Sequence, residues 1–363
     1  MCVDKPFRLF SCCIPVRGAE RSAICDLQRQ KMHFIPDGLY EILTQHEGKT
    51  AGQVKAAYQH RFDETIDSYF HLLEKEEYIF YTETPERFPK MSLRWDEPAL
   101  ITNGIIDIGE TILPWSEIIL QLEALGCRYL HIRCYTGRPL SFFDALLQKF
   151  DGSSVESIIL TIRFLSDYAE PLLLDLCTRF PRLSALQIHS MPTGHPFCLG
   201  PAPAGPLFFS EEQLNSSVHC GIISPAYFRI NVKTFTEALN HNSCLNRKIS
   251  IDVNGDIKNC PSLQESFGNI DNSTLQDAVG KEGFKKYWPI TKDQVSVCKD
   301  CEFRYICTDC RAYLAGPDDL FSKPLKCGYD PYTCEWDDWA DNPLKQRTAE
   351  YYGMQDILKQ RGR

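Results

Sequence analysis

Apolar positions recur with a regular strand–helix spacing between residues 101 and 189. Four strand-like runs start 26, 28 and 28 residues apart: Ile101–Ile108, Cys127–Cys134, Val155–Ile162 and Leu183–His189. Amphipathic helices are predicted between them, over Pro114–Leu125, Leu140–Phe150 and Asp167–Phe180. This alternation indicates βαβ units and a parallel sheet. Four units are too few to close an eight-stranded barrel, so we predict an α/β fold with a curved, partial barrel.

The repeat is bounded by proline-containing segments. A linker with Pro85, Pro89 and Pro98 precedes it, and the Pro-rich loop Met191–Pro206 follows it. We expect one more strand at Ala226–Val232 and a helix at Lys233–Asn240, which assigns residues 91–240 to one domain. His131 and His189 lie in or near predicted strands and are candidates to face a pocket, although a structural histidine is the commoner outcome.

Residues 1–90 predict a separate small module. Strands are expected at Phe7–Pro15, Ser22–Gln28, Lys31–Ile35 and Tyr78–Tyr81. Three helices fall between the last two strands, and Thr50 is the predicted N-cap of the second. The third follows Asp63 and has apolar residues at i, i+3, i+4 and i+7, namely Ile66, Tyr69, Phe70 and Leu73. This order of elements is typical of a winged-helix-like module.

After residue 240 the chain has few long apolar runs and many cysteines. The cysteines from Cys244 to Cys334 follow the pattern C-x10-G-x4-C, then C-x2-C-x5-C-x2-C, then two single cysteines. The stretch Asp252–Asp256 between alternating residues predicts a hairpin turn with positive φ at Gly255, which brings Cys244 and Cys260 together. Residues 241–345 form the third predicted region, and residues 346–363 form a polar, helical tail.

Composition narrows the class of protein. The chain has 363 residues, 43% hydrophobic and 24% charged, as in ordinary globular proteins. Its net charge of −9 argues against a broad nucleic-acid footprint, so no nucleic-acid partner is expected. No apolar run approaches the roughly 18 residues of a membrane span, and no signal segment follows Met1. We therefore expect a cytoplasmic protein with reduced thiols and no membrane partner.

Three kinds of cysteine chemistry compete. Disulfides belong mainly to short secreted proteins, and 17 cysteines is an odd number. Zinc is the stronger rival, but paired C-x2-C motifs of zinc ribbons usually lie about 15–20 residues apart. Here five residues separate Cys301 from Cys307, and no histidine lies between Cys244 and Cys334. Such a tight run favours iron–sulfur clusters, in which the last cysteine of a run can ligate the other cluster.

The spacing and the run Cys-Lys-Asp-Cys-Glu-Phe-Arg-Tyr-Ile-Cys-Thr-Asp-Cys-Arg-Ala at 298–312 resemble a SPASM domain. SPASM domains extend many radical SAM enzymes that modify peptides, and they hold two auxiliary [4Fe–4S] clusters. The family's last pair is usually C-x3-C, whereas Cys307 and Cys310 are separated by two residues. The whole chain resembles the SPASM protein of grasp-with-spasm systems. Those systems pair a peptide maturase of this kind with an ATP-grasp ligase and a small precursor peptide.

The resemblance implies a ligand set. Cys244, Cys260 and Cys310 would ligate one cluster, and Cys220 is the nearest upstream candidate for its fourth ligand. Cys298, Cys301 and Cys307 would ligate the other cluster. Cys327 would complete it, with Cys334 as the alternative.

Residues 91–240 resemble a shortened radical SAM core that lacks its defining motif. The family places C-x3-C-x2-C after the first strand, where three thiolates leave one iron open to S-adenosylmethionine. The segment Thr102–Leu113 holds no cysteine, and this pattern occurs nowhere in the chain. We therefore expect no S-adenosylmethionine cofactor, and whether the chain catalyses a step stays open.

Two functions remain in view. In the first, the N-terminal module resembles leader-peptide recognition domains, which bind an extended leader by β-augmentation. The chain would then be a maturation component for a ribosomally synthesised, post-translationally modified peptide. In the second, it is a cluster- or zinc-dependent redox regulator with a DNA-binding winged helix. The predicted second and third helices carry many acidic residues beside their basic ones, which favours leader binding.

Overall fold

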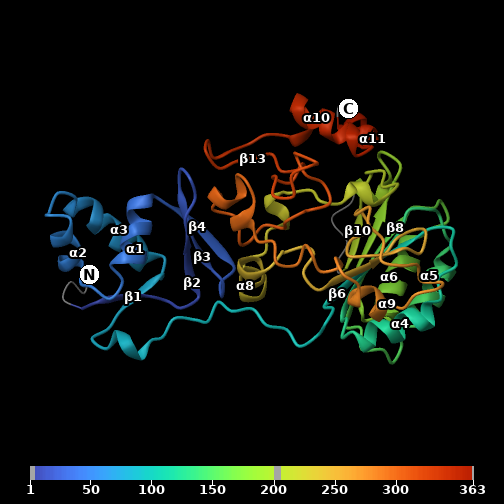
Figure 1. Cartoon of the computed structure of the whole chain (residues 1–363), viewed down its shortest axis with the longest axis horizontal. Coiled ribbons are helices and arrows are strands. Elements are labelled where there is room, and N and C mark those ends of the chain that lie inside the picture. The colour runs from blue at the N-terminus through green and yellow to red at the C-terminus, as the bar shows by residue number, and fades with distance from the viewer. Residues whose placement is uncertain (1–4, 200–205, 362–363) are drawn as a thin grey trace.

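A computed structural model describes residues 5–199 and 206–361 of the chain (Figure 1). The largest element is a mostly parallel sheet of seven strands in the order β10-β9-β8-β7-β6-β11-β12. Its strands are β6 (Asn103–Ile108), β7 (Tyr129–Cys134), β8 (Ser157–Arg163), β9 (Leu183–His189), β10 (Leu207–Phe209), β11 (Lys248–Ile251) and β12 (Ile257–Lys258). Neighbours pair in parallel except β11 and β12. The predicted α/β class with a mostly parallel sheet is confirmed.

Helices cover one face of this sheet. They are α4 (Trp115–Ala124), α5 (Leu140–Gln148), α6 (Glu170–Arg179) and α9 (Leu275–Gly280). Successive strand residues point to opposite faces. Accordingly Leu130, Ile132 and Cys134 of β7 join the helices in one buried core, whereas His131 and Arg133 point to the other face. That second face is left available to the cysteine-rich region.

Two details of this region differ from the sequence prediction. Ala226–Val232 is not a strand, because Ser224 caps the short 3₁₀ helix Pro225–Tyr227 instead. A helix does follow, α8 (Val232–Asn240), with Asn231 as its N-cap. β10 comes directly after the predicted Pro-rich loop, of which residues 200–205 lie outside the described part of the chain.

The N-terminal module contains two small sheets and three helices. β2 (Cys13–Val16), β3 (Ser22–Asp26) and β4 (Lys31–Ile35) form an antiparallel sheet. β1 (Phe7–Leu9) pairs instead with β5 (Ile79–Tyr81), so the single strand predicted at Phe7–Pro15 is divided by a turn. The helices are α1 (Asp37–Gln45), α2 (Ala51–Ala57) and α3 (Asp63–Lys75), and Thr50 caps α2 as predicted.

The C-terminal third is mostly loops. It contains the short hairpin of β13 (Tyr329–Asp330) and β14 (Glu335–Trp336), followed by α10 (Pro343–Tyr351) and α11 (Gln355–Arg361). Ala349 and Met354 of this helical tail are fully buried and share a core with Cys310 and Tyr313. The tail therefore packs on the cysteine-rich region, above the sheet in Figure 1. No described helix has the length and apolar character that crossing a bilayer requires.

Candidate metal centre

The structure gathers four cysteines, here termed the first cysteine group, around one cavity of about 650 Å³. They are Cys220, Cys244, Cys260 and Cys310. Cys244 precedes β11 and Cys260 follows β12, so the hairpin between these strands sets their separation. The other two come from distant loops, one immediately after the 3₁₀ turn Ser217–His219 and one after the run at 298–307.

The hairpin forms for a local reason. Gly255 has φ +83°, as the sequence predicted. Asp252 Oδ1 accepts hydrogen bonds from the backbone amides of Asn254 and Asp256, at 2.9 and 3.1 Å. β11 and β12 then pair through Ser250–Lys258 and Ile251–Ile257, and Cys244 and Cys260 come to line the same cavity.

Gly221, which follows Cys220, allows the chain to pass close to Cys310. Gly221 has φ +82°, and a Cβ at this position would lie only 2.8 Å from Cys310 Sγ. A glycine is thus required both by the backbone conformation and by the neighbouring thiol. The structure therefore places Cys220 with the cysteines that the sequence pattern joined.

A second cysteine group lines a separate pocket with aromatic walls. Its members are Cys298, Cys301, Cys307 and Cys327, and Phe303 and Tyr329 lie against them. Cys334 is not among the residues that line this pocket; it occupies the turn between β13 and β14 with φ +60°. The structure thus brings Cys327, and not Cys334, to the other three.

Burial raises the pKa of several of these thiols. It raises the pKa of Cys298 to about 12, and burial together with the neighbouring Cys220 and Cys244 raises that of Cys260 to about 12. Lys292 acts in the opposite direction on the pKa of Cys307, which burial raises, by donating to its sulfur at 3.3 Å. Metal binding would have to displace these protons, so it depends on pH.

The spacing of the sulfur atoms distinguishes between metals. A tetrahedral zinc with Zn–S bonds of about 2.3 Å holds its sulfurs roughly 3.8 Å apart. Among the described residues, only Cys12, Cys13 and Asp26 bring three ligand atoms within 4.8 Å of one another. In neither four-cysteine group do three sulfurs lie within 4.8 Å of one another. This spacing disfavours a single tetrahedral zinc ion in either group.

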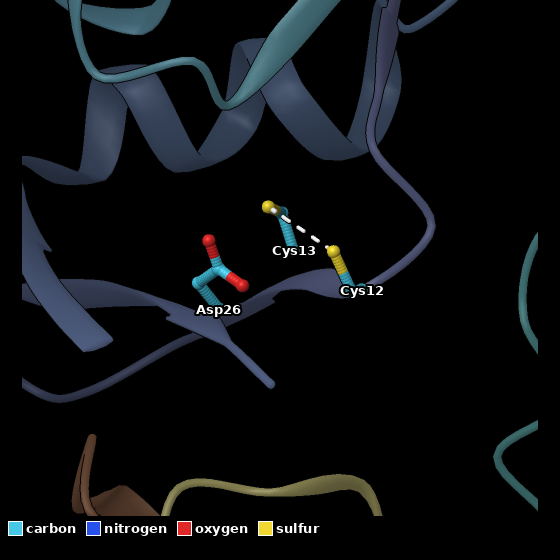
Figure 2. A group of neighbouring side chains, drawn as sticks. All are labelled: Cys12, Cys13 and Asp26. Carbon is cyan, nitrogen blue, oxygen red and sulfur yellow. Dashed lines mark hydrogen bonds between the residues drawn. The ribbon is translucent and has the colours of Figure 1, made fainter. Parts of the chain in front are cut away.

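The Cys12–Cys13–Asp26 cluster lies in the N-terminal module (Figure 2), and the two sulfurs are 4.0 Å apart. Both oxygens of Asp26 already have partners. Oδ2 accepts from Arg29 Nε at 2.5 Å, and Oδ1 accepts from the backbone amides of Gln28 and Arg29. These bonds assign Asp26 to the turn that links β3 to β4.

A row of polar side chains crosses the face of the sheet that is not covered by helices and that faces the first cysteine group. Strand register aligns Asp107, Arg133, Thr161 and Gln187 on four neighbouring strands. Arg133 donates to both oxygens of Asp107, at 2.6 and 2.8 Å, and the pair is buried. Sequence reasoning missed this row, although polar residues at every second position of apolar strands were its signal.

Both histidines singled out from the sequence line the same cavity. Burial lowers the pKa of His131 to about 3 and that of His189 to about 4, so both rings are neutral. Thr161 donates to Gln187 Oε1 at 2.8 Å, which leaves its oxygen to accept from His131 Nε2 at 2.9 Å. On the side of the sheet, the cavity wall is therefore a neutral hydrogen-bonded network beside the buried ion pair of Asp107 and Arg133.

The loop after β6 packs closely against the cysteine hairpin. A Cβ on Gly109 would lie 2.6 Å from the carbonyl oxygen of Val253, and Arg138 donates to the Gly109 carbonyl at 3.1 Å. This is the segment in which the sequence lacks a three-cysteine motif. The hairpin of the cysteine-rich region here contacts the sheet directly, and β11 pairs with β6 along four residues.

The N-terminal module lies directly against the second cysteine group. Val16, Cys25 and Leu27 share a buried core with residues that include Phe303, Ile306, Cys307, Cys327 and Tyr329. Arg21 donates to Glu302 Oε1 at 2.7 Å, and Tyr329 donates to the same oxygen at 2.5 Å. The module is therefore one wall of the second group's surroundings.

Comparison with known proteins supports the chemistry of this region. Residues 243–302 match the SPASM family, an iron-sulfur cluster-binding domain, and the match includes cysteines of both groups. No curated protein matches the chain. Among solved structures, it is similar to Streptococcus suis SuiB bound to precursor peptide SuiA, with a TM-score of 0.34 and 10% identity over 87% of this chain and 98% of that chain. That TM-score is too low to establish a common fold, whereas the SPASM match implies iron–sulfur cluster binding.

Proposed function

We propose that this protein is a maturation component for a ribosomally synthesised peptide and that it carries two auxiliary [4Fe–4S] clusters. The observation behind the proposal is the gathering of eight cysteines into two groups of four, in neither of which three sulfurs lie within 4.8 Å of one another. The first cysteine group holds one cluster and the second holds the other. The clusters cross-link loops that are far apart in the sequence, and this offsets the small apolar core of the region.

The N-terminal module supplies the leader-binding surface, and two observations favour the β4 edge of its sheet. β2, the opposite edge, contains Pro15, which has no N–H to donate, and Cys13 N already bonds Phe10 O. The backbone of β4 has no partner beyond β3 among the described residues. An extended leader adds to β4 by β-augmentation.

The side chains of β4 contact both the rest of the N-terminal module and the cysteine-rich region. His33 of β4 packs on Tyr78 at a ring distance of 5.9 Å, whereas Phe34 packs on Phe303 at 5.7 Å. A leader on β4 therefore lies beside Phe303, which lines the pocket of the second cysteine group. An ATP-grasp ligase is the proposed partner that modifies the presented peptide.

The first test measures metal. Anaerobically purified full-length protein should contain about eight irons and eight acid-labile sulfides per chain. Stoichiometric zinc with negligible sulfide would contradict the proposal and would favour a zinc-dependent regulator.

The second test measures peptide binding by the full chain, because Val16, Cys25 and Leu27 of the module need the C-terminal region to be buried. Random 20-residue peptides are selected by display against the protein, and hydrogen exchange is followed in the complex. We expect protection of β4, with binding lost when proline enters the paired stretch of the peptide. Protection elsewhere, or binding only to duplex DNA with a steep salt dependence, would exclude leader recognition at this edge.

A further inference from the structure

Each cysteine group has one lysine whose ammonium group points at a thiol. Lys292 is 4% exposed, and its Nζ donates to Cys307 Sγ at 3.3 Å in the second group. Lys248, at the start of β11, donates to Cys244 Sγ at 3.7 Å in the first group. A strand and a 3₁₀ turn that are far apart in the sequence thus present the same kind of contact.

The positive charge of Lys292 is not balanced by a carboxylate of its own. The nearest carboxylate is Asp309, with Oδ1 4.0 Å from Nζ. Asp309 is already held by Arg311 at 2.6 Å and by Asn242 at 2.7 Å, both buried. Arg311 balances Asp309, so the buried ammonium of Lys292 needs another anion to offset its desolvation.

Lys248 has no carboxylate within 4.0 Å among the described residues. Its neighbour in the same hairpin behaves differently, since Lys258 pairs with Asp252 at 2.8 Å. Burial raises the pKa of the Glu237 carboxyl and Lys248 counteracts that rise, but Glu237 accepts its hydrogen bond from Asn246, at 2.9 Å. The ammonium of Lys248 instead donates to Cys244 of the first cysteine group.

We propose that Lys248 and Lys292 are charge-compensating residues, each donating an N–H···S hydrogen bond to a ligating thiolate and raising the reduction potential of its cluster. Four thiolates around [4Fe–4S]²⁺ leave a net charge of −2, and reduction adds another negative charge. Hydrogen bonds to the sulfurs and net charge both set cluster potentials, and hydrogen bonds to ionised groups are the stronger ones. The inference rests on the clusters of the proposed function.

The test uses full-length, anaerobically reconstituted protein. Lys292→Met and Lys248→Met remove the charge but keep a long apolar stem, and the Lys→Arg variants restore it. Lys258→Met is the matched control, because it removes a lysine of the same hairpin that contacts no thiol. Iron and sulfide content, the melting temperature and a dithionite titration followed by electron paramagnetic resonance are measured for each variant.

We expect Lys292→Met to shift one cluster signal to a more negative potential and Lys248→Met to shift the other, with Lys→Arg close to wild type. A folded Met variant that loses about four irons, recovered by Arg, supports the same role. Met variants with full iron and unchanged potentials would overturn it, as would iron loss that Arg does not recover or an equal shift in Lys258→Met. Wild-type protein without sulfide would instead refute the clusters of the proposed function.

Discussion

Lys326 donates its Nζ hydrogen to the backbone carbonyl of Cys220 at 2.8 Å. It also donates to the carbonyl of Val218, and it is 1% exposed. Lys326 precedes Cys327 of the second cysteine group, whereas Cys220 belongs to the first. The side chain of Lys326 thus links the loop that contains Cys220 of the first group to the segment that contains Cys327 of the second.

Lys326→Met should lower the free energy of unfolding by about 1.5–3 kcal/mol, because two buried carbonyls lose a charged donor. Iron should be lost first from the site that contains Cys220. Chemical denaturation and iron analysis check this. Lys281→Met is the control, since Lys281 donates to the carbonyl of Phe267 and touches no cysteine. Equal iron loss in both variants would contradict the role of Lys326.

Gly221→Ala should reduce iron from about eight to about four per chain, because its Cβ would meet Cys310 Sγ. Gly152→Ala provides the matched control: Gly152 has φ +79°, but no atom lies within 4 Å of its added Cβ. Alanine is strained at the positive φ of either position, so both variants should lose stability, but only Gly221→Ala should lose a cluster. Full iron in Gly221→Ala would show that Cys220 and Cys310 do not share a site.

Serine substitutions should sort the cysteines into two sets. Cys220→Ser and Cys260→Ser should each lose one cluster, and Cys301→Ser and Cys327→Ser the other, if each cluster depends on four thiolates. Cys334→Ser should retain about eight irons, because Cys334 lies outside the second pocket. The cluster that remains is identified by its electron paramagnetic resonance signal. Iron loss in Cys334→Ser with full iron in Cys327→Ser would reverse the assignment.

Arg133→Met should destabilise the fold by about 3–5 kcal/mol at neutral pH, because Asp107 is left charged and buried. Burial raises the pKa of Asp107 and Arg133 counteracts that rise, so the pKa of Asp107 should rise further in the variant. The pKa of Asp107 in the folded protein is then above its unfolded value of 3.8. The stability that this carboxyl contributes is therefore fully present below pH 3.8 and is lost as pH rises through the folded pKa.

The deficit of Arg133→Met relative to wild type should therefore be small near pH 4 and large near pH 7. Urea denaturation at several pH values measures it. Arg128→Met, which breaks the exposed pair with Glu156, should cost about 0–1 kcal/mol at any of these pH values. A deficit that does not change with pH would refute this account of Asp107.

The parts that sequence could predict are those with local causes. Strand Leu183–His189 and the Thr50 cap depend on neighbours within a few residues, and both are as predicted. Gly255 likewise predicts the hairpin turn in which it adopts a positive φ. The failed strand at Ala226–Val232 had a local signal as well, because Ser224 and Pro225 start a 3₁₀ turn and Asn231 caps the next helix.

Other features depend on contacts between distant segments. β11 joins the main sheet beside β6, so the sheet continues beyond residue 240, where the chain was divided by sequence pattern. Cys220 is separated from the first cysteine of the motif by 23 residues, and its position is set by Lys326 and by the bridge between Ile223 and Cys327. No periodicity along the chain predicts such contacts. The alternation within each strand marks the polar positions of the row from Asp107 to Gln187, but only the strand register aligns them.

The packing of the N-terminal module has a consequence for synthesis of the chain. Val16, Cys25 and Leu27 leave the ribosome early, yet Phe303 and Tyr329, which cover them, are made roughly 280–310 residues later. At about 5–20 residues per second, the apolar face waits on the order of 15–60 s for its partner. Such long-range contacts slow folding, and this apolar face stays exposed until the C-terminal third has been synthesised.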